Sequence, residues 1–170
     1  MPQYRPKRKP KLKIAVLLKT MGRGRDSLLP EDKHRRALRN FCIALAKGDQ
    51  ATAKKELDVI ESAQGKGELW NGFLWGLNGM YEAATRKDIR ALFVMAYSKL
   101  SPEEIKKIMA ELKREEGALF LSERERGVLE ANLLGLETVL DALEKGIIKR
   151  EEKAADQTQI LDEDSSYPSE

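Results

Sequence analysis

The chain has one His and one Cys, the side chains most often used for proton transfer and thiolate chemistry near neutral pH. His34 and Cys42 fall on one predicted helix, which separates them by roughly 12 Å at about 1.5 Å per residue. That distance is too long for a thiolate–base pair, and one His cannot supply the second Glu-x-x-His motif of a di-iron carboxylate bundle. We interpret Cys42 as a partly buried side chain and His34 as a surface side chain.

The residue types of the chain argue against a metal site, a disulfide and a nucleotide-binding loop. A single Cys excludes an intramolecular disulfide, and one Cys with one His exclude a zinc site built from several such ligands. The segment Gly22-Arg23-Gly24 lacks the following Lys and the preceding long strand of a phosphate-binding loop. We therefore predict no catalytic residue, no metal site and no cofactor. An enzyme built only from carboxylates and lysines stays open as a third alternative.

Positive charge is concentrated at the beginning of the chain. Residues 1–40 hold 13 Lys or Arg and three acidic residues, so the net charge of +3 conceals an asymmetry along the chain. Many cations with few acids are typical of surfaces that bind nucleic-acid phosphates, and Arg next to Gly offers forked donors to them. The candidate nucleic-acid-binding residues are Arg5, Lys7, Arg8, Lys9, Lys11, Lys13, Lys19, Arg23, Arg25, Arg35, Arg36 and Arg39.

The predicted function is that of a non-enzymatic RNA-associated protein, with the ribosome as one candidate assembly. RNA is favoured over DNA, and base-specific recognition is not indicated because no RNA-recognition strand motif, helix-turn-helix or zinc finger is present. A solubilising tail or a contact with an anionic membrane surface are the alternative interpretations of the arm. The membrane is disfavoured because the arm lacks strong amphipathicity.

These residues would be carried by a body made of helices. Apolar residues recur at three- and four-residue intervals and predict helices that start near 30, 50, 68, 88, 102 and 123. Ser101-Pro102-Glu103-Glu104 and Ser122-Glu123-Arg124-Glu125 are capping boxes, which define two of these starts most specifically. Pro30 is suited to the first position of the first helix, and Asp88 to the cap of the fourth.

The predicted fold is all-α, either a helical bundle or a short array of antiparallel helical hairpins with about six helices. A disordered basic arm (1–29) precedes the helical domain (30–150), and a disordered acidic tail (151–170) follows it. The third helix is expected to be the most buried, whereas the apolar run 14–18 fits either a strand or a helix.

The cellular location of the protein and the type of organism it comes from are predicted from the composition of the chain. No apolar run is long enough to span a membrane and no signal peptide is discernible, which predicts a cytoplasmic protein. Abundant Lys and Glu with few Asn and Gln are compatible with a thermophilic source.

The alternative function is that of a helical protein–protein interaction scaffold. The first helical hairpin resembles a tetratricopeptide-type unit, but Trp70 is not followed by the Gly and Tyr of that repeat, and we assign no family. On the third helix Trp75 lies about 140° from Trp70, so one of the two could be an exposed anchor for a partner. Leucines on the last helix form a seam that suits either a packed bundle or a homodimer. The candidate partner-binding residues are Trp75, Leu129, Leu133, Leu136 and Leu140.

Overall fold

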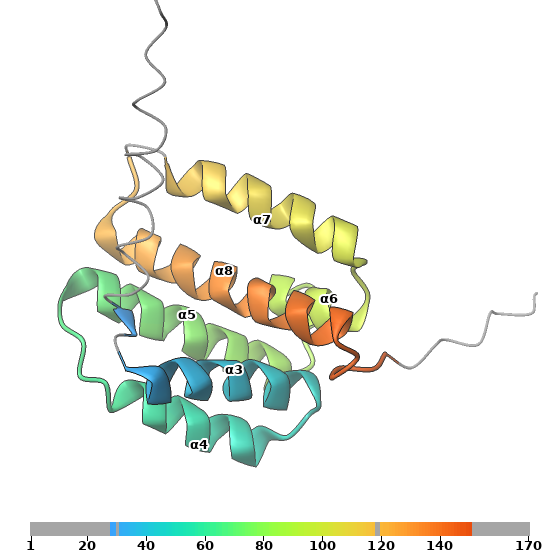
Figure 1. Ribbon diagram of the computed structural model, residues 1–170. Coiled ribbons are helices and arrows are strands. Elements are labelled where there is room, and N and C mark those ends of the chain that lie inside the picture. Colours follow the sequence, from blue (N-terminus) through green and yellow to red (C-terminus); the bar gives the residue numbers. More distant parts are fainter. Residues whose placement is uncertain (1–27, 30, 118–119, 151–170) are drawn as a thin grey trace, which may run out of the picture.

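The computed structural model describes residues 28–29, 31–117 and 120–150, and within them it is all-helical (Figure 1). The six helices are close to those that the apolar periodicity predicts, and their bounds are α3 (Asp32–Ala46), α4 (Gln50–Glu61), α5 (Gly67–Thr85), α6 (Leu92–Ser98), α7 (Pro102–Glu116) and α8 (Glu123–Glu144). The all-α bundle predicted from the sequence is therefore confirmed. The predictions for most of the basic arm, for the run 14–18 and for the acidic tail fall outside the described residues.

Helix α8 is at the centre of the bundle. It packs against α3, α5, α6 and α7, while α4 packs on the outer side of α3 (Figure 1). Its buried side includes Leu133, Leu136 and Val139, each almost completely excluded from solvent. The expectation that the third helix, α5, would be the most buried is wrong, because six of its 19 residues are buried, against seven of 15 in α3 and eight of 22 in α8.

Helices α5 and α8 approach until their backbones touch. A Cβ atom built on Gly72 would lie 1.9 Å from the carbonyl oxygen of Arg124, and one built on Gly127 would lie 2.1 Å from the carbonyl oxygen of Leu69. Neither position can hold a side chain without moving the backbone opposite. The small residues that permit this contact recur every fourth position on both helices, and they are Gly72, Gly76, Gly127, Ala131 and Gly135.

The two helices of this closest pair, which are not neighbours in sequence, run parallel to each other. Gly72 lies next to Arg124, and Gly135 lies next to Met80, so the residue numbers of α5 and α8 increase in the same direction. The hairpins α3–α4 and α7–α8 are antiparallel, as expected for helices joined by short links (Figure 1). Because α5 and α8 are parallel, the chain must return through α6 and α7 before α8 can pack on α5.

The helix starts show where local sequence decides structure. Both capping boxes are confirmed: the Ser101 Oγ accepts from the Glu104 N–H at 3.1 Å, and the Ser122 Oγ accepts from the Glu125 N–H at 3.2 Å. The predicted cap at Asp88 is wrong, because α6 begins at Leu92 after the N-cap residue Ala91. Asp88 instead accepts a hydrogen bond from the Arg90 N–H and so organises the turn that precedes α6. Pro30 is outside the described residues.

Candidate binding surfaces

Of the predicted nucleic-acid-binding residues, the described part of the chain contains the three on α3. Arg35, Arg36 and Arg39 are all exposed, and Arg35 and Arg39 are one helical turn apart. The other nine residues lie outside the described residues, and they are Arg5, Lys7, Arg8, Lys9, Lys11, Lys13, Lys19, Arg23 and Arg25.

Two of the three arginines already face carboxylates. Arg39 Nη2 lies 3.2 Å from Asp141 Oδ2 on α8, and Arg35 Nε lies 3.6 Å from Asp32 Oδ1 one turn earlier on α3. Hydrogen bonding with Lys145, helped by the charge of Arg39, lowers the pKa of Asp141, so this carboxylate is ionised near neutral pH. Exposed pairs of this kind contribute little to stability, which leaves the guanidinium groups available to exchange a carboxylate for a phosphate.

The chain enters the body directly before α3. Leu28 and Leu29 are both buried and belong to the main hydrophobic core. Their burial anchors residues 28–29 in the core, directly before α3 in sequence.

Burial removes the two most reactive side chains from solvent. Burial raises the pKa of the Cys42 thiol to about 12, although a hydrogen bond with Thr138 acts in the opposite direction. A thiol with that pKa is not a nucleophile near neutral pH. The prediction of a surface His34 is wrong: its side chain is 2% exposed, and neither ring nitrogen has a hydrogen-bond partner within 28–29, 31–117 and 120–150. His34 lies on the apolar side of α3 with Leu38 and Phe41.

The described residues do not assemble a cluster suited to metal binding. No three His, Cys, Asp or Glu side chains within them are placed to hold a metal ion. Glu130 on α8 is a buried carboxylate, and it is not among the lining residues of the groove beside Trp75 or of the two hollows where α3 and α6 end.

Trp75 lies at the edge of an apolar groove. Its side chain is 63% exposed, and the Arg124 guanidinium lies over the indole at 5.3 Å from the ring centroid. The adjoining groove has a volume of about 280 Å³ and lies among α5, α6 and α8. Gly79 leaves open space on its α5 side, and Leu92 and Val128 add apolar surface. The groove provides a small apolar surface next to an aromatic anchor.

The predicted leucine seam on α8 belongs to the interior of the chain itself. Leu133 and Leu136 are buried in the main core, and Leu129 and Leu140 are partly buried and packed against it. Leu133 and Leu136 therefore have no surface left for a partner in the folded bundle, whereas Leu129 and Leu140 keep part of theirs, and their role in binding a partner stays a prediction. Trp75 is the most exposed of the predicted partner-binding residues.

Comparison of the chain with protein-family models, with curated proteins and with solved structures gave no match. None of the helices in the described residues is both long enough and apolar enough to cross a bilayer. The function must therefore be argued from the charge, burial and surfaces of this chain.

Proposed function

We propose that this protein is a non-enzymatic RNA-associated protein that binds the phosphate backbone through its basic amino-terminal segment. The supporting observation is continuity of charge. The cations of residues 5–25 lead into the buried pair Leu28 and Leu29, and the exposed face of α3 then adds Arg35, Arg36 and Arg39. Phosphate contacts of this kind supply affinity without base specificity.

The helical body would contribute a second contact or a fixed shape next to the bound strand. RNA is favoured over DNA, with the ribosome as one candidate assembly, and a cytoplasmic setting is part of the same proposal. The Lys- and Glu-rich composition also suggests a thermophilic source. A midpoint of thermal unfolding well above the roughly 45–65 °C of mesophilic domains would support that source.

A binding titration at several salt concentrations tests the proposal. Labelled single-stranded RNA, duplex RNA and duplex DNA are titrated with the full chain and with a variant carrying Gln at Arg5, Arg8, Arg23 and Arg25. Each phosphate contact contributes about 0.7 to the slope of log affinity against log salt on a single strand, so four lost contacts reduce the slope by about 3.

The control variant removes the same number of arginines from the body. Arg86, Arg90, Arg114 and Arg126 are exposed, and their replacement by Gln changes the net charge equally. We expect this control to keep nearly the full slope. An equal decrease of the slope in both variants would mean that binding depends on net charge and not on the amino-terminal segment, which would contradict the proposal. Absence of binding by the full chain at low salt would refute it.

The exposed Trp75 supports a second candidate function, self-association through the apolar groove. Sedimentation at high salt tests it, because apolar contacts do not weaken with screening as phosphate contacts do. A dimer that persists at high salt and dissociates in Trp75→Ser is the expected result. Ile89→Ser, which removes another exposed apolar side chain, is the control and should leave the dimer intact. A monomeric full chain would refute this candidate.

A further inference from the structure

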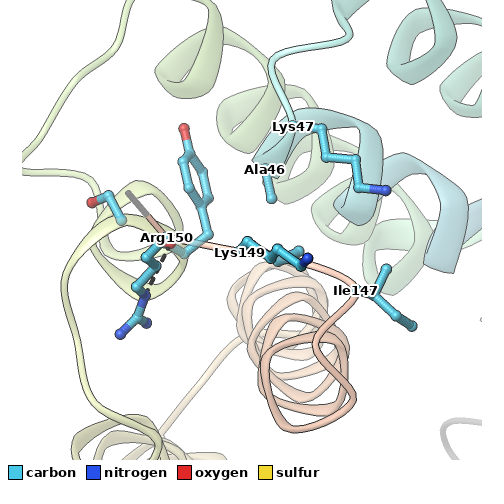
Figure 2. Close-up of a pocket in the computed structure, with 8 residues that line it drawn as sticks. Ala46, Lys47, Ile147, Lys149 and Arg150 are labelled. Carbon is cyan, nitrogen blue, oxygen red and sulfur yellow. Dashed lines mark hydrogen bonds between the residues drawn. The ribbon is translucent and has the colours of Figure 1, made fainter. Parts of the chain in front are cut away.

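Two adjoining hollows occupy the end of the molecule where α3 and α6 terminate. Their volumes are about 660 Å³ and 560 Å³, and they share the lining residues Ala46, Lys47, Tyr97 and Ser98. Figure 2 shows the first hollow, with Lys47 from the end of α3 and Lys149 and Arg150 from the segment that follows α8; the Arg150 guanidinium is turned towards the end of α6. We refer to the two hollows together as the basic cleft.

The charge of the basic cleft has one sign. Lys47, Lys87, Lys149 and Arg150 line it, and among the described residues no Asp or Glu does. The acidic residues next to these lysines in sequence are directed elsewhere. Asp49 accepts a hydrogen bond from the Thr52 N–H at 3.0 Å at the start of α4, and Asp88 accepts one from the Arg90 N–H at 3.0 Å. The cleft therefore favours an anionic occupant.

The cleft also offers apolar surface. Ile89 is 67% exposed on its wall, and Ile147 and Val94 lie among the lining residues. Exposed apolar side chains beside several cations suit a peptide that carries both aliphatic side chains and carboxylates. A free inorganic anion would use only the cations.

The position at which the chain leaves the body is fixed at this cleft. The Arg150 guanidinium donates to the carbonyl oxygen of Ala96 at 2.7 Å and to that of Tyr97 at 3.3 Å, and it also donates to Leu100. These bonds attach the segment after α8 to the carboxyl end of α6, where carbonyl groups lack helical partners. Arg150, the residue directly before the acidic segment in sequence, is therefore held at the cleft.

We propose that the acidic segment 151–170 of this chain docks in the basic cleft. The segment contains seven Asp or Glu and one Lys, and Ile160-Leu161 is followed directly by Asp162-Glu163-Asp164. The two aliphatic side chains fit the surface around Ile89, and the three carboxylates fit the rim that carries Lys47 and Lys87. Charge and apolar pattern are thus complementary between the cleft and the segment.

The chain length permits the contact. Ile160 is ten positions after Arg150, and an extended chain spans at most about 36 Å over that length, roughly the diameter of a domain of this size. Because the segment is tethered, its effective concentration at the cleft is on the order of millimolar. Weak complementary contacts are then sufficient to keep the cleft occupied for much of the time.

Paramagnetic relaxation in the full chain tests the proposal. A Cys introduced at Ser166 carries a nitroxide, and buried Cys42 is replaced by Val so that the label has one position. We expect the amide signals of Lys47, Ile89 and Tyr97 to lose intensity, in a manner independent of protein concentration. Raising the ionic strength from about 0.1 M to about 1 M, which shortens the Debye length from roughly 10 Å to roughly 3 Å, should restore part of that intensity.

Charge reversal provides the matched controls. Lys47→Glu with Lys87→Glu should abolish the intensity loss, and so should Asp162→Lys with Glu163→Lys and Asp164→Lys. Combining all five substitutions should restore it. Lys55→Glu with Lys107→Glu reverses the charge of two exposed lysines outside the cleft. This control should leave the intensity loss unchanged. Thermal unfolding of each variant verifies that it is folded.

Three results would overturn the proposal. One is an unchanged spectrum on labelling. Another is intensity loss confined to residues 5–25 or to the part of α3 that carries Arg35, Arg36 and Arg39, without loss at Lys47, Ile89 and Tyr97, which would place the segment on the basic arm or its neighbouring arginines. The last is intensity loss that appears only when a labelled chain is mixed with an unlabelled isotope-enriched one, which would mean contact between two copies.

Discussion

At the residue scale, α3 shows how burial decides the role of a reactive side chain. Cys42 is enclosed by the core, and its raised pKa keeps it a neutral thiol that packs as a small apolar group. His34 shares the apolar side of the same helix, yet its two ring nitrogens find no partner within the described residues. A polar group buried in this way costs free energy that an apolar side chain would not.

We therefore predict that His34→Leu stabilises the protein. The substitution removes two buried polar atoms and keeps a similar side-chain volume, so the free energy of unfolding should rise by about 1 to 3 kcal/mol. Chemical denaturation near neutral pH measures it. His34→Gln, which keeps a polar side chain at the site, should bring no such gain. A loss of stability in His34→Leu would mean that the imidazole is hydrogen-bonded.

The burial of His34 could have been predicted from the sequence. His34, Leu38, Phe41 and Leu45 are separated by four, three and four residues, the spacing that places side chains on one face of a helix. The basic cleft could not have been predicted in this way. Lys47 and Lys87 each follow a helix end and are 40 residues apart in sequence, so they meet only through the packing of α3, α5 and α6.

At the element scale, the contact between α5 and α8 depends on glycines. The spacing of apolar residues in the sequence does not reveal their role. The spacing of Leu133 and Leu136 predicts an apolar seam on the last helix, but it does not indicate which helix covers that seam. The four-residue spacing of Gly72 with Gly76, and of Gly127 with Ala131 and Gly135, carries that information, because small residues at this spacing allow two helix backbones to touch.

Gly127→Ala should destabilise the protein by about 3 kcal/mol or more. The added methyl group would meet the backbone of Leu69 and Phe73 at 2.1 and 2.6 Å, and neither backbone atom can rotate away. Urea unfolding monitored by circular dichroism measures the change.

Gly79→Ala is the matched control on α5. A Cβ atom there meets no heavy atom within 4 Å, so the methyl group adds no clash. Replacing an unobstructed helical Gly by Ala should instead raise stability by about 0.5 to 1 kcal/mol. Equal changes in stability for Gly127→Ala and Gly79→Ala would show that the backbones of α5 and α8 are not in close contact at Gly127.

The capping boxes make the stability of the protein depend on pH. Backbone and side-chain hydrogen bonds from Ser122 lower the pKa of Glu125 below its ordinary value of 4.5, and those from Ser101 do the same for Glu104. A carboxyl group with a lowered pKa in the folded chain stabilises it above the unfolded pKa. That contribution is lost as the pH falls from 4.5 through the folded value.

Glu125→Gln tests this dependence. The wild-type chain should be more stable than the variant near neutral pH, and the difference should shrink towards zero as the pH falls below about 4.5. Urea midpoints measured across that range give the difference. A difference that stays constant with pH would show that the charge of Glu125 has no part in the cap.

At the scale of the whole molecule, stability is distributed unevenly around α8. Helix α8 contacts four other helices, whereas α7 buries only Ile105 and Met109 and packs mainly on α8. Few buried apolar contacts allow a helix to open without unfolding the rest.

Hydrogen exchange should therefore protect the amides of α7 least among the longer helices. The slowest amides should lie where α5 and α8 touch, around Phe73 and Ala131, because exposing them requires global unfolding. Mass spectrometry of exchanged peptides measures both groups. Equal protection of α7 and α8 would mean that the bundle opens as one unit.

The parallel pairing of α5 and α8 also bears on the order in which the chain can fold during synthesis. Helices α3 and α4 form a local hairpin as soon as both have been made, but the contact between Gly72 and Arg124 joins residues 52 positions apart. Until α8 emerges, Phe73 and Leu77 lack their main covering helix. The nascent chain must therefore carry an exposed apolar face through the translation of α6 and α7, when it is most open to chaperones and to aggregation.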